Sequence, residues 1–130
     1  NFVRTILDKA ATTDKLEVVD DQIGSPTYTR DLAVAVDLLL ERNIKGIFHI
    51  TNRGNCSWFQ FACKILQAGG ITGVQVLPIK TDQLMRPARR PCYSVLSMQK
   101  FIAATGKTMQ PWQLALQDYL HDVRYQSSKK

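Results

Sequence analysis

Short apolar runs rich in β-branched residues alternate with longer segments of helical periodicity along this chain. Apolar residues recur at helical spacing over 1–11, 29–41, 57–68 and 111–123. The short runs predict buried strands at 16–19, 46–50 and 74–79. This alternation predicts an α/β fold in which helices cover a small sheet, whose remaining strands lie upstream in the intact protein.

Residue types at the helix ends support these boundaries. Ser57 is followed by Gln60 at the spacing of a capping box, in which each side chain bonds the backbone N–H of the other residue. Gly69 and Gly70 are expected to end that helix. The other expected start signals are Thr29 for the second helix, Ser97 for a short helix through Ile102, and Pro111 for the last helix.

The composition is that of a globular chain. Of the 130 residues, 45% are hydrophobic and 22% are charged, and no apolar run approaches the ~20 residues that a membrane span needs. The chain starts with Asn1 inside a helical pattern, so we expect a fragment of a longer protein. Residues 1–124 are expected to form one domain, and residues 125–130 a polar tail.

Cysteine usage favours a reducing compartment. The three cysteines, Cys56, Cys63 and Cys92, are an odd number and form no CxxC pair, so neither a disulfide framework nor a zinc site is predicted. No targeting segment is recognisable at the start of the sequence. We therefore expect a cytoplasmic protein without a membrane partner.

Positive charge is concentrated in the second part of the chain. Residues 1–45 carry six basic and eight acidic residues, whereas residues 46–130 carry eleven and three. The densest point lies in a long connector, residues 80–94, and comprises Arg86, Arg89 and Arg90. Guanidinium groups bind phosphate oxygens bidentately, so one interpretation is a site for a phosphorylated ligand, and the other is a solvated basic loop. Nucleic acid is not an expected partner, because exposed aromatic residues are not interleaved with the basic ones.

A distinctive run of acidic and small residues occupies positions 18–33, which read VVDDQIGSPTYTRDLA. The further motifs are NFV at 1–3, GIFHIT at 46–51, CSW at 56–58, RP at 90–91 followed by SVL at 94–96, and PW at 111–112. In type and order these motifs resemble the C-terminal part of the dTDP-4-dehydrorhamnose reductases, members of the extended short-chain dehydrogenase/reductase superfamily. The resemblance extends to Val123.

This resemblance implies an N-terminal Rossmann domain, which binds NADPH or NADH, and a smaller C-terminal domain for the sugar nucleotide. It implies reduction of dTDP-4-dehydro-L-rhamnose to dTDP-L-rhamnose in cell-surface polysaccharide synthesis. The glycine-rich loop and the catalytic Tyr-x-x-x-Lys pair of the family lie upstream. Tyr125 and Lys129 have that spacing, but they stand in the terminal tail outside a strand-to-helix context. The chain alone is therefore predicted to be catalytically incomplete.

The resemblance also implies a set of substrate-binding residues, namely Asn1, Gln22, Gly24, Pro26, Thr27, Arg89 and Arg90. Gln22 and Thr27 would supply hydrogen bonds in a loop that follows a strand end, where α/β folds bind ligands. Arg90 would neutralise the diphosphate, with Arg89 and Arg86 as weaker candidates.

An alternative interpretation assigns structural roles to the same residues. Gly24 and Pro26 would only shape a turn, while Asp20 and Asp21 would cap neighbouring backbone groups. The aromatic residues on apolar helical faces are expected in the core, namely Trp58, Phe59 and Trp112. Neither His49 nor His121 is interpreted as an acid, a base or a metal ligand.

Assembly and metal use are left open by the sequence. Some members of the family hold magnesium at a dimer contact through acidic side chains, so magnesium and a homodimer are both possible here. Unpaired edges of the strands predicted at 16–19 and 46–50 favour pairing with a second copy. The alternative to an enzyme part is a non-catalytic regulatory or binding module of the same superfamily.

Overall fold

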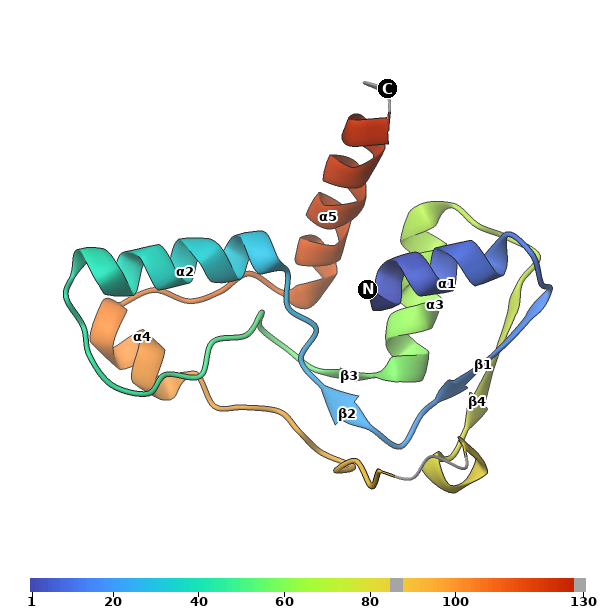
Figure 1. Ribbon diagram of the computed structural model, residues 1–130, viewed down its shortest axis with the longest axis horizontal. Coiled ribbons are helices and arrows are strands. Elements are labelled where there is room, and N and C mark those ends of the chain that lie inside the picture. Colours follow the sequence, from blue (N-terminus) through green and yellow to red (C-terminus); the bar gives the residue numbers. More distant parts are fainter. Residues whose placement is uncertain (85–87, 128–130) are drawn as a thin grey trace. The chain divides into compact units, whose positions relative to one another are not determined.

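The computed structural model describes residues 1–84 and 88–127, whose helices and strands are drawn in Figure 1. The chain divides into two compact units, each built from two separate stretches of sequence. The first unit comprises Asn1–Gly24 and Cys56–Ser94, and the second comprises Ser25–Asn55 and the chain from Val95 onward. None of the described helices combines the length and apolar character needed to cross a lipid bilayer.

The first unit contains a parallel pair of strands and two principal helices. Its elements are α1 (Phe2–Ala10), β1 (Lys15–Val19), β2 (Ile23–Gly24), β3 (Cys56–Ser57), α3 (Trp58–Gly69), β4 (Gln75–Ile79) and the 3₁₀ helix η1 (Thr81–Leu84). β1 and β4 pair in parallel, from Lys15 opposite Gln75 to Val19 opposite Ile79. The α/β fold is therefore confirmed, as are the strands predicted at 16–19 and 74–79.

The ends of α3 follow the sequence signals. Ser57 and Gln60 form the capping box: Ser57 Oγ accepts from Gln60 N at 3.1 Å, and Gln60 Oε1 accepts from Ser57 N at 3.0 Å. Gly70 ends the helix with φ of 70°, a left-handed conformation that glycine adopts without steric cost. The boundaries predicted for this helix are confirmed.

Apolar side chains from α1, α3 and β1 form the core of the first unit. The buried members are Val3, Ile6, Leu16, Val18, Phe61, Ala62, Ile65 and Leu66. At one end of the two helices, the Phe2 and Phe61 rings stack with centroids 5.6 Å apart. The Trp58 and Phe2 ring centroids are 4.7 Å apart, but Trp58 is 39% exposed. Its expected core position is therefore only partly confirmed.

The second unit is helical in its described part. Its helices are α2 (Thr29–Glu41), α4 (Gln99–Thr105) and α5 (Trp112–Ser127). Ala35, Phe101 and Met109 form a buried cluster, against which Leu38, Leu39, Phe48, Ile50 and Met98 pack. Trp112 is buried as predicted, and α5 starts directly after Pro111. His121 on α5 is exposed, in agreement with the expected solvated face.

A buried polar network joins α2 to the segment before α5. Asn52 is fully buried, and its Oδ1 accepts from Tyr28 N at 2.7 Å. Its Nδ2 donates to Asp31 Oδ2 at 2.6 Å and to Gln110 O at 3.3 Å. Gln110 Nε2 in turn donates to both Asp31 oxygens, at 3.1 and 2.9 Å. Each of these groups therefore keeps hydrogen bonds in exchange for those it loses to water.

The strand predicted at 46–50 is wrong. Within the described residues this segment forms no ladder, and Ile47 is 80% exposed. Phe48 and Ile50 instead pack on the helical cluster of the second unit, and Lys100 Nζ donates to Ile47 O at 2.8 Å. A β-rich sequence forms a strand only where a partner strand meets its backbone groups, and here the neighbours are helices. The unpaired edge expected for 46–50 is therefore absent too.

Two predicted helix starts are displaced by one residue, and the connector has structure of its own. The N-cap of α2 is Tyr28, and Thr29 is the first helical residue. The Tyr28 N–H donates to Asn52 Oδ1. The N-cap of α4 is Met98, and Ser97 Oγ accepts from Gln99 N at 3.4 Å. The connector at 80–94 contains η1 and a bridge of Tyr93 to Ile23.

Candidate functional site

The loop that contains Gln22 starts where two parallel strands end together. Val19 and Ile79 are the last paired residues of β1 and β4, and Asp20 N donates to Ile79 O at 3.0 Å. Segments that follow parallel strands emerge at the same edge of a sheet, where α/β folds bind ligands. The loop from Asp20 and the helix η1 therefore lie next to each other.

Asp21, Thr81 and Gln22 form a chain of hydrogen bonds at this edge. Thr81 donates to the Asp21 carboxylate from Oγ1 at 2.6 Å and from its backbone N at 3.1 Å. Gln22 Nε2 donates to Thr81 Oγ1 at 2.9 Å. The Thr81 hydroxyl, followed by the Thr81 backbone N–H, holds the pKa of Asp21 below its ordinary value. Asp21 is thus an ionised acceptor that fixes Thr81.

Backbone hydrogen bonds join the arginine-bearing segment to the same loop. Ile23 N donates to Cys92 O at 2.8 Å, and Ser94 N donates to Ile23 O at 2.9 Å. Ile23 also pairs with Ser57 of β3 in an antiparallel bridge. Because Cys92 is fixed beside Ile23, the preceding arginines come next to Gln22.

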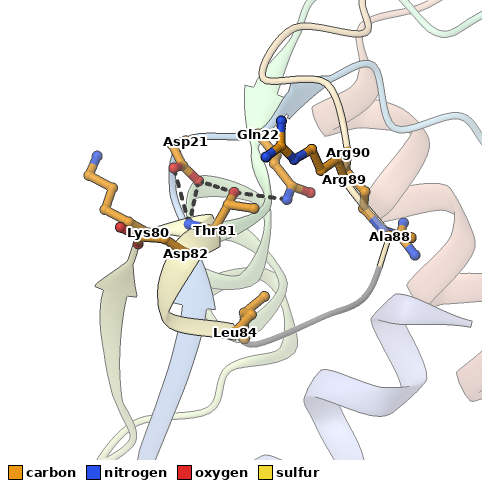
Figure 2. A pocket seen from close by; sticks show the side chains of 9 residues that line it. All are labelled: Asp21, Gln22, Lys80, Thr81, Asp82, Leu84, Ala88, Arg89 and Arg90. Carbon is orange, nitrogen blue, oxygen red and sulfur yellow. Dashed lines mark hydrogen bonds between the residues drawn. The ribbon is translucent and has the colours of Figure 1, made fainter.

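These segments enclose an open cavity of about 540 Å³ within the first unit. The described residues that line it are Asp21, Gln22, Lys80, Thr81, Asp82, Leu84, Ala88, Arg89 and Arg90. Figure 2 shows the side chains of η1 on one side, the two arginines on the other, and Gln22 between them. Three predicted site residues, Gln22, Arg89 and Arg90, are therefore brought together.

Among the described residues that line the cavity, cationic side chains outnumber acidic ones, with Lys80, Arg89 and Arg90 against Asp21 and Asp82. Both arginines are exposed, and within 1–84 and 88–123 no ion pair or hydrogen bond engages their guanidinium groups. The Asp21 carboxylate, by contrast, is engaged by Thr81. The free cations of this site are suited to an anionic ligand, and phosphate is the group whose oxygens guanidinium forks match.

Two of the other predicted contact residues have structural roles within the first unit. Asn1 Oδ1 accepts from Arg4 N at 3.0 Å and so caps α1. Gly24 lies in β2, where a Cβ atom would come 3.2 Å from Ser94 Oγ, so glycine permits the close approach of that segment. Neither Asn1 nor Gly24 is among the described residues that line the cavity.

The remaining predicted residues fall elsewhere. Pro26 and Thr27 belong to the second unit, where Thr27 Oγ1 donates to Ser25 O at 3.0 Å and accepts from Asn52 N at 3.2 Å. Arg86 and Lys129 lie outside the described residues. Substrate binding by Pro26, Thr27 and Arg86 stays a prediction.

Thr81 and Lys80 are site residues that sequence reasoning did not identify. Thr81 is sixty positions from Asp21 in sequence, so no local motif connects them. The signal that would have found it is the parallel register, because residues directly after two neighbouring parallel strands share an edge. The bond from Thr81 N to Asp21 agrees with the alternative interpretation, in which Asp21 caps a backbone group.

The described residues offer no second kind of chemistry. Within 1–84 and 88–123, no group of three or more His, Cys, Asp or Glu side chains is arranged to hold a metal ion. Cys56, Cys63 and Cys92 are free thiols. Burial raises the pKa of Cys56 to about 12, which makes this thiol a poor nucleophile.

Proteins named for polysaccharide biosynthesis and for dTDP-4-dehydrorhamnose reduction are similar to this chain. The spore coat polysaccharide biosynthesis protein SpsK of Bacillus subtilis is 43% identical over 94% of this chain and 42% of its own length. The dTDP-4-dehydrorhamnose reductase of Mycolicibacterium smegmatis is 40% identical over 91% of this chain and 36% of its own length. The chain thus spans less than half the length of these relatives.

Solved structures and a family comparison agree with these relatives. A dTDP-4-dehydrorhamnose reductase structure from Clostridium acetobutylicum matches 95% of this chain and 44% of its own with a TM-score of 0.90 and 39% identity. One from Bacillus anthracis, in complex with NADP, matches 94% of this chain and 43% of its own with a TM-score of 0.90 and 35% identity. The family described as the RmlD substrate binding domain matches residues 1–125. The chain therefore belongs to the RmlD substrate binding domain family.

Proposed function

We propose that this chain is the sugar-nucleotide-binding part of an NADPH-dependent reductase that converts dTDP-4-dehydro-L-rhamnose to dTDP-L-rhamnose. The M. smegmatis relative is named for that activity, and the B. anthracis structure holds NADP. The name of the B. subtilis relative supports a place in polysaccharide synthesis. Together these similarities favour an enzyme part over a non-catalytic module of the superfamily.

The observation that carries the substrate assignment is the cationic cavity at the ends of β1 and β4. Arg89 and Arg90 expose guanidinium groups on one side of Gln22, and neither has a partner among the described residues. A nucleotide diphosphate offers oxygens that guanidinium groups bind bidentately. Its sugars carry hydroxyl groups that an amide can bind, which fits the place of Gln22 beside the arginines.

The nicotinamide cofactor is assigned to a part of the enzyme outside this chain. The sequence contains no GxGxxG loop, so the residues present do not form the phosphate-binding turn of a dinucleotide site. When bound, the cofactor supplies the hydride. The residues of this chain bind and orient the sugar nucleotide, and their free thiols support a reducing, cytoplasmic compartment.

A partner for the outer edge of β1 belongs to the same proposal. In the described residues β1 pairs with β4 alone, which leaves one row of its backbone groups for a further strand. That strand comes from the rest of the reductase or from a second copy of this chain. Sedimentation at high concentration separates the two sources, since only the second predicts a dimer of the isolated chain.

The test of the substrate assignment is calorimetric titration of the chain with dTDP and UDP. Arg90→Ala should weaken dTDP binding about 10-fold to 100-fold, because a charge-assisted hydrogen bond contributes roughly 1.5–3 kcal/mol. Arg4→Ala is the matched control, since it removes the same charge from the same unit at a side chain that does not line the cavity. Binding should also weaken as salt is raised.

Two results would contradict the substrate assignment. One is a folded chain, with native circular dichroism, that binds neither nucleotide. The other is an Arg90→Ala variant that binds dTDP as tightly as the Arg4→Ala control.

A further inference from the structure

The direction of each proton in the Asp21–Thr81–Gln22 chain can be assigned. A threonine hydroxyl has one hydrogen to donate and two lone pairs to accept with. The 2.6 Å contact of Thr81 Oγ1 with Asp21 Oδ1 uses that hydrogen, because a carboxylate with a lowered pKa is ionised and only accepts. Towards Gln22, the Thr81 hydroxyl is therefore an acceptor.

This assignment fixes the orientation of the Gln22 amide. The atom 2.9 Å from Thr81 Oγ1 must be the donor Nε2, since a carbonyl oxygen there would face a lone pair. The other end of the amide, Oε1, then lies on the side of Arg89 and Arg90, as Figure 2 shows. The nitrogen of the Gln22 amide thus faces Thr81 and the oxygen faces the arginines, because the Thr81 hydroxyl can only accept from Gln22.

The Gln22 side chain is mostly buried, but only one end of its amide has a protein partner among the described residues. Gln22 is 7% exposed and lines the cavity. No residue within 1–84 and 88–123 donates a hydrogen bond to Oε1. Gln22 Oε1 is not among the fully buried atoms that lack a partner, so water in the open cavity reaches it. A ligand that fills the cavity would displace this water and would have to supply the donor in its place.

We propose that Gln22 Oε1 accepts a hydrogen bond from an O–H or N–H group of the bound sugar nucleotide, and that Thr81 and Asp21 are positioning residues for this contact. The inference rests on the proposed function. The ligand donor lies beside the diphosphate, since the arginines share the cavity with Gln22. The hexose hydroxyls are present in dTDP-L-rhamnose only, whereas the 3′-hydroxyl of the deoxyribose and the N–H of the base are present in dTDP as well.

The orientation of the amide is tested first, without ligand. The side-chain NH₂ of Gln22 is assigned by ¹⁵N NMR in the chain and in three variants. Thr81→Val removes the acceptor and should shift these signals and speed their exchange with water, while Thr81→Ser keeps the hydroxyl and should leave them unchanged. Asp21→Asn offers Thr81 a donor, which frees the Thr81 hydrogen for Gln22, so the NH₂ signals should move as well. Signals that ignore both Thr81→Val and Asp21→Asn would overturn the orientation.

The ligand contact is tested by titration with dTDP-L-rhamnose and dTDP. Gln22→Met keeps the size of the side chain but removes its acceptor. The variant should bind dTDP-L-rhamnose about 5-fold more weakly, which is the effect of losing one neutral hydrogen bond. Thr81→Val should weaken dTDP-L-rhamnose binding by a smaller factor, and the Thr81→Ser variant should bind as tightly as the parent chain. A loss of affinity restricted to dTDP-L-rhamnose assigns the donor to the hexose, and an equal loss with dTDP assigns it to the deoxyribose or the base.

Failure of this inference differs from failure of the proposed function. If the chain binds dTDP-L-rhamnose and Arg90→Ala weakens it, but Gln22→Met and Thr81→Val bind normally, the Gln22 contact is wrong and the substrate assignment stands. If the folded chain binds neither nucleotide, both the substrate assignment and the ligand contact are wrong. The NMR result then still decides the orientation of the amide.

Discussion

Two buried side-chain amides, one in each unit, are used in different ways. Asn52 in the second unit is fully buried, and both ends of its amide are bonded, to Tyr28 N at 2.7 Å and to Asp31 Oδ2 at 2.6 Å. Gln22 in the first unit is 7% exposed, but only its Nε2 has a described partner. Under the proposed contact, the difference separates a polar group that completes a fold from one whose second hydrogen bond comes from a ligand.

The comparison predicts that substitutions of the two amides have opposite signatures. Removing the fully bonded amide should destabilise the unit that contains it, because its neighbours lose hydrogen bonds. Removing the half-bonded amide should cost little stability but reduce binding. Measurements of unfolding can therefore test a conclusion about ligand binding.

The largest effect is expected for Asn52→Leu. It leaves the Tyr28 N–H without its acceptor and removes one of the donors to the Asp31 carboxylate, which keeps Gln110 Nε2. Because a buried unsatisfied group costs about 1–3 kcal/mol and a further hydrogen bond is lost, the free energy of unfolding should fall by roughly 2–3 kcal/mol. Gln22→Met should cost about 1 kcal/mol. Urea unfolding followed by Trp112 fluorescence in a Trp58→Phe background measures the first value. A Gln22→Met variant as unstable as Asn52→Leu would make Gln22 a structural residue.

Two glycines sharpen the same contrast between a packed and an open environment. Gly54 in the second unit has φ of 89°, and a Cβ atom there would lie 3.2 Å from Trp112 Cδ1. Gly73 in the first unit has φ of 86°, with nothing within 4 Å of the same position. Both backbones are in a region that costs an alanine about 1–2 kcal/mol.

Gly54→Ala should therefore destabilise the protein by roughly 1 kcal/mol more than Gly73→Ala, because only Gly54 adds a steric clash to the backbone cost. Urea unfolding of the two variants gives the difference. Equal losses would mean that Trp112 moves aside without cost, and that the packing around Gly54 is looser than its contacts indicate.

Local signals were sufficient to predict the described α-helices and the two strands of the parallel pair, but not the short strands β2 and β3. The capping box of Ser57 and Gln60 is confirmed because a cap is formed by residues three positions apart. The prediction at 46–50 is wrong because strand formation depends on a distant partner, which residue types alone do not reveal. Thr81 could not be predicted as a site residue for the same reason, since its partner Asp21 is sixty positions away in sequence.

The candidate site shows a similar division. Gln22, Arg89 and Arg90 are brought to one cavity because the backbone of Ile23 bonds the segment that follows the arginines. The resemblance that suggested these residues reports which positions recur in a family. It does not report which end of the Gln22 amide faces the cavity, because that depends on one proton of Thr81.

The smallest expected effect is a loss of stability in acid, and one carboxylate of each unit is compared. A hydrogen bond from the Thr81 hydroxyl lowers the pKa of Asp21 below 3.8, and one from the Tyr28 hydroxyl lowers that of Asp122 in the second unit. The unfolded chain then takes up these protons at a higher pH than the folded chain. The stabilisation is complete well above pH 3.8 and is lost as the pH falls through 3.8 to the lower folded-state value.

Asp21→Asn removes the contribution of this carboxylate to the pH dependence of stability, in the first unit only. The free energy of unfolding of the variant should therefore fall less between about pH 5 and 3 than that of the parent chain. Asp122→Asn is the matched control, because it removes the corresponding carboxylate of the second unit. Urea unfolding across this range, followed by Trp58 fluorescence in a Trp112→Phe background, reports on the first unit. If Asp21→Asn and the parent chain lose stability in parallel, the Thr81 contact does not hold Asp21 ionised, and the proton assignment that orients Gln22 loses its basis.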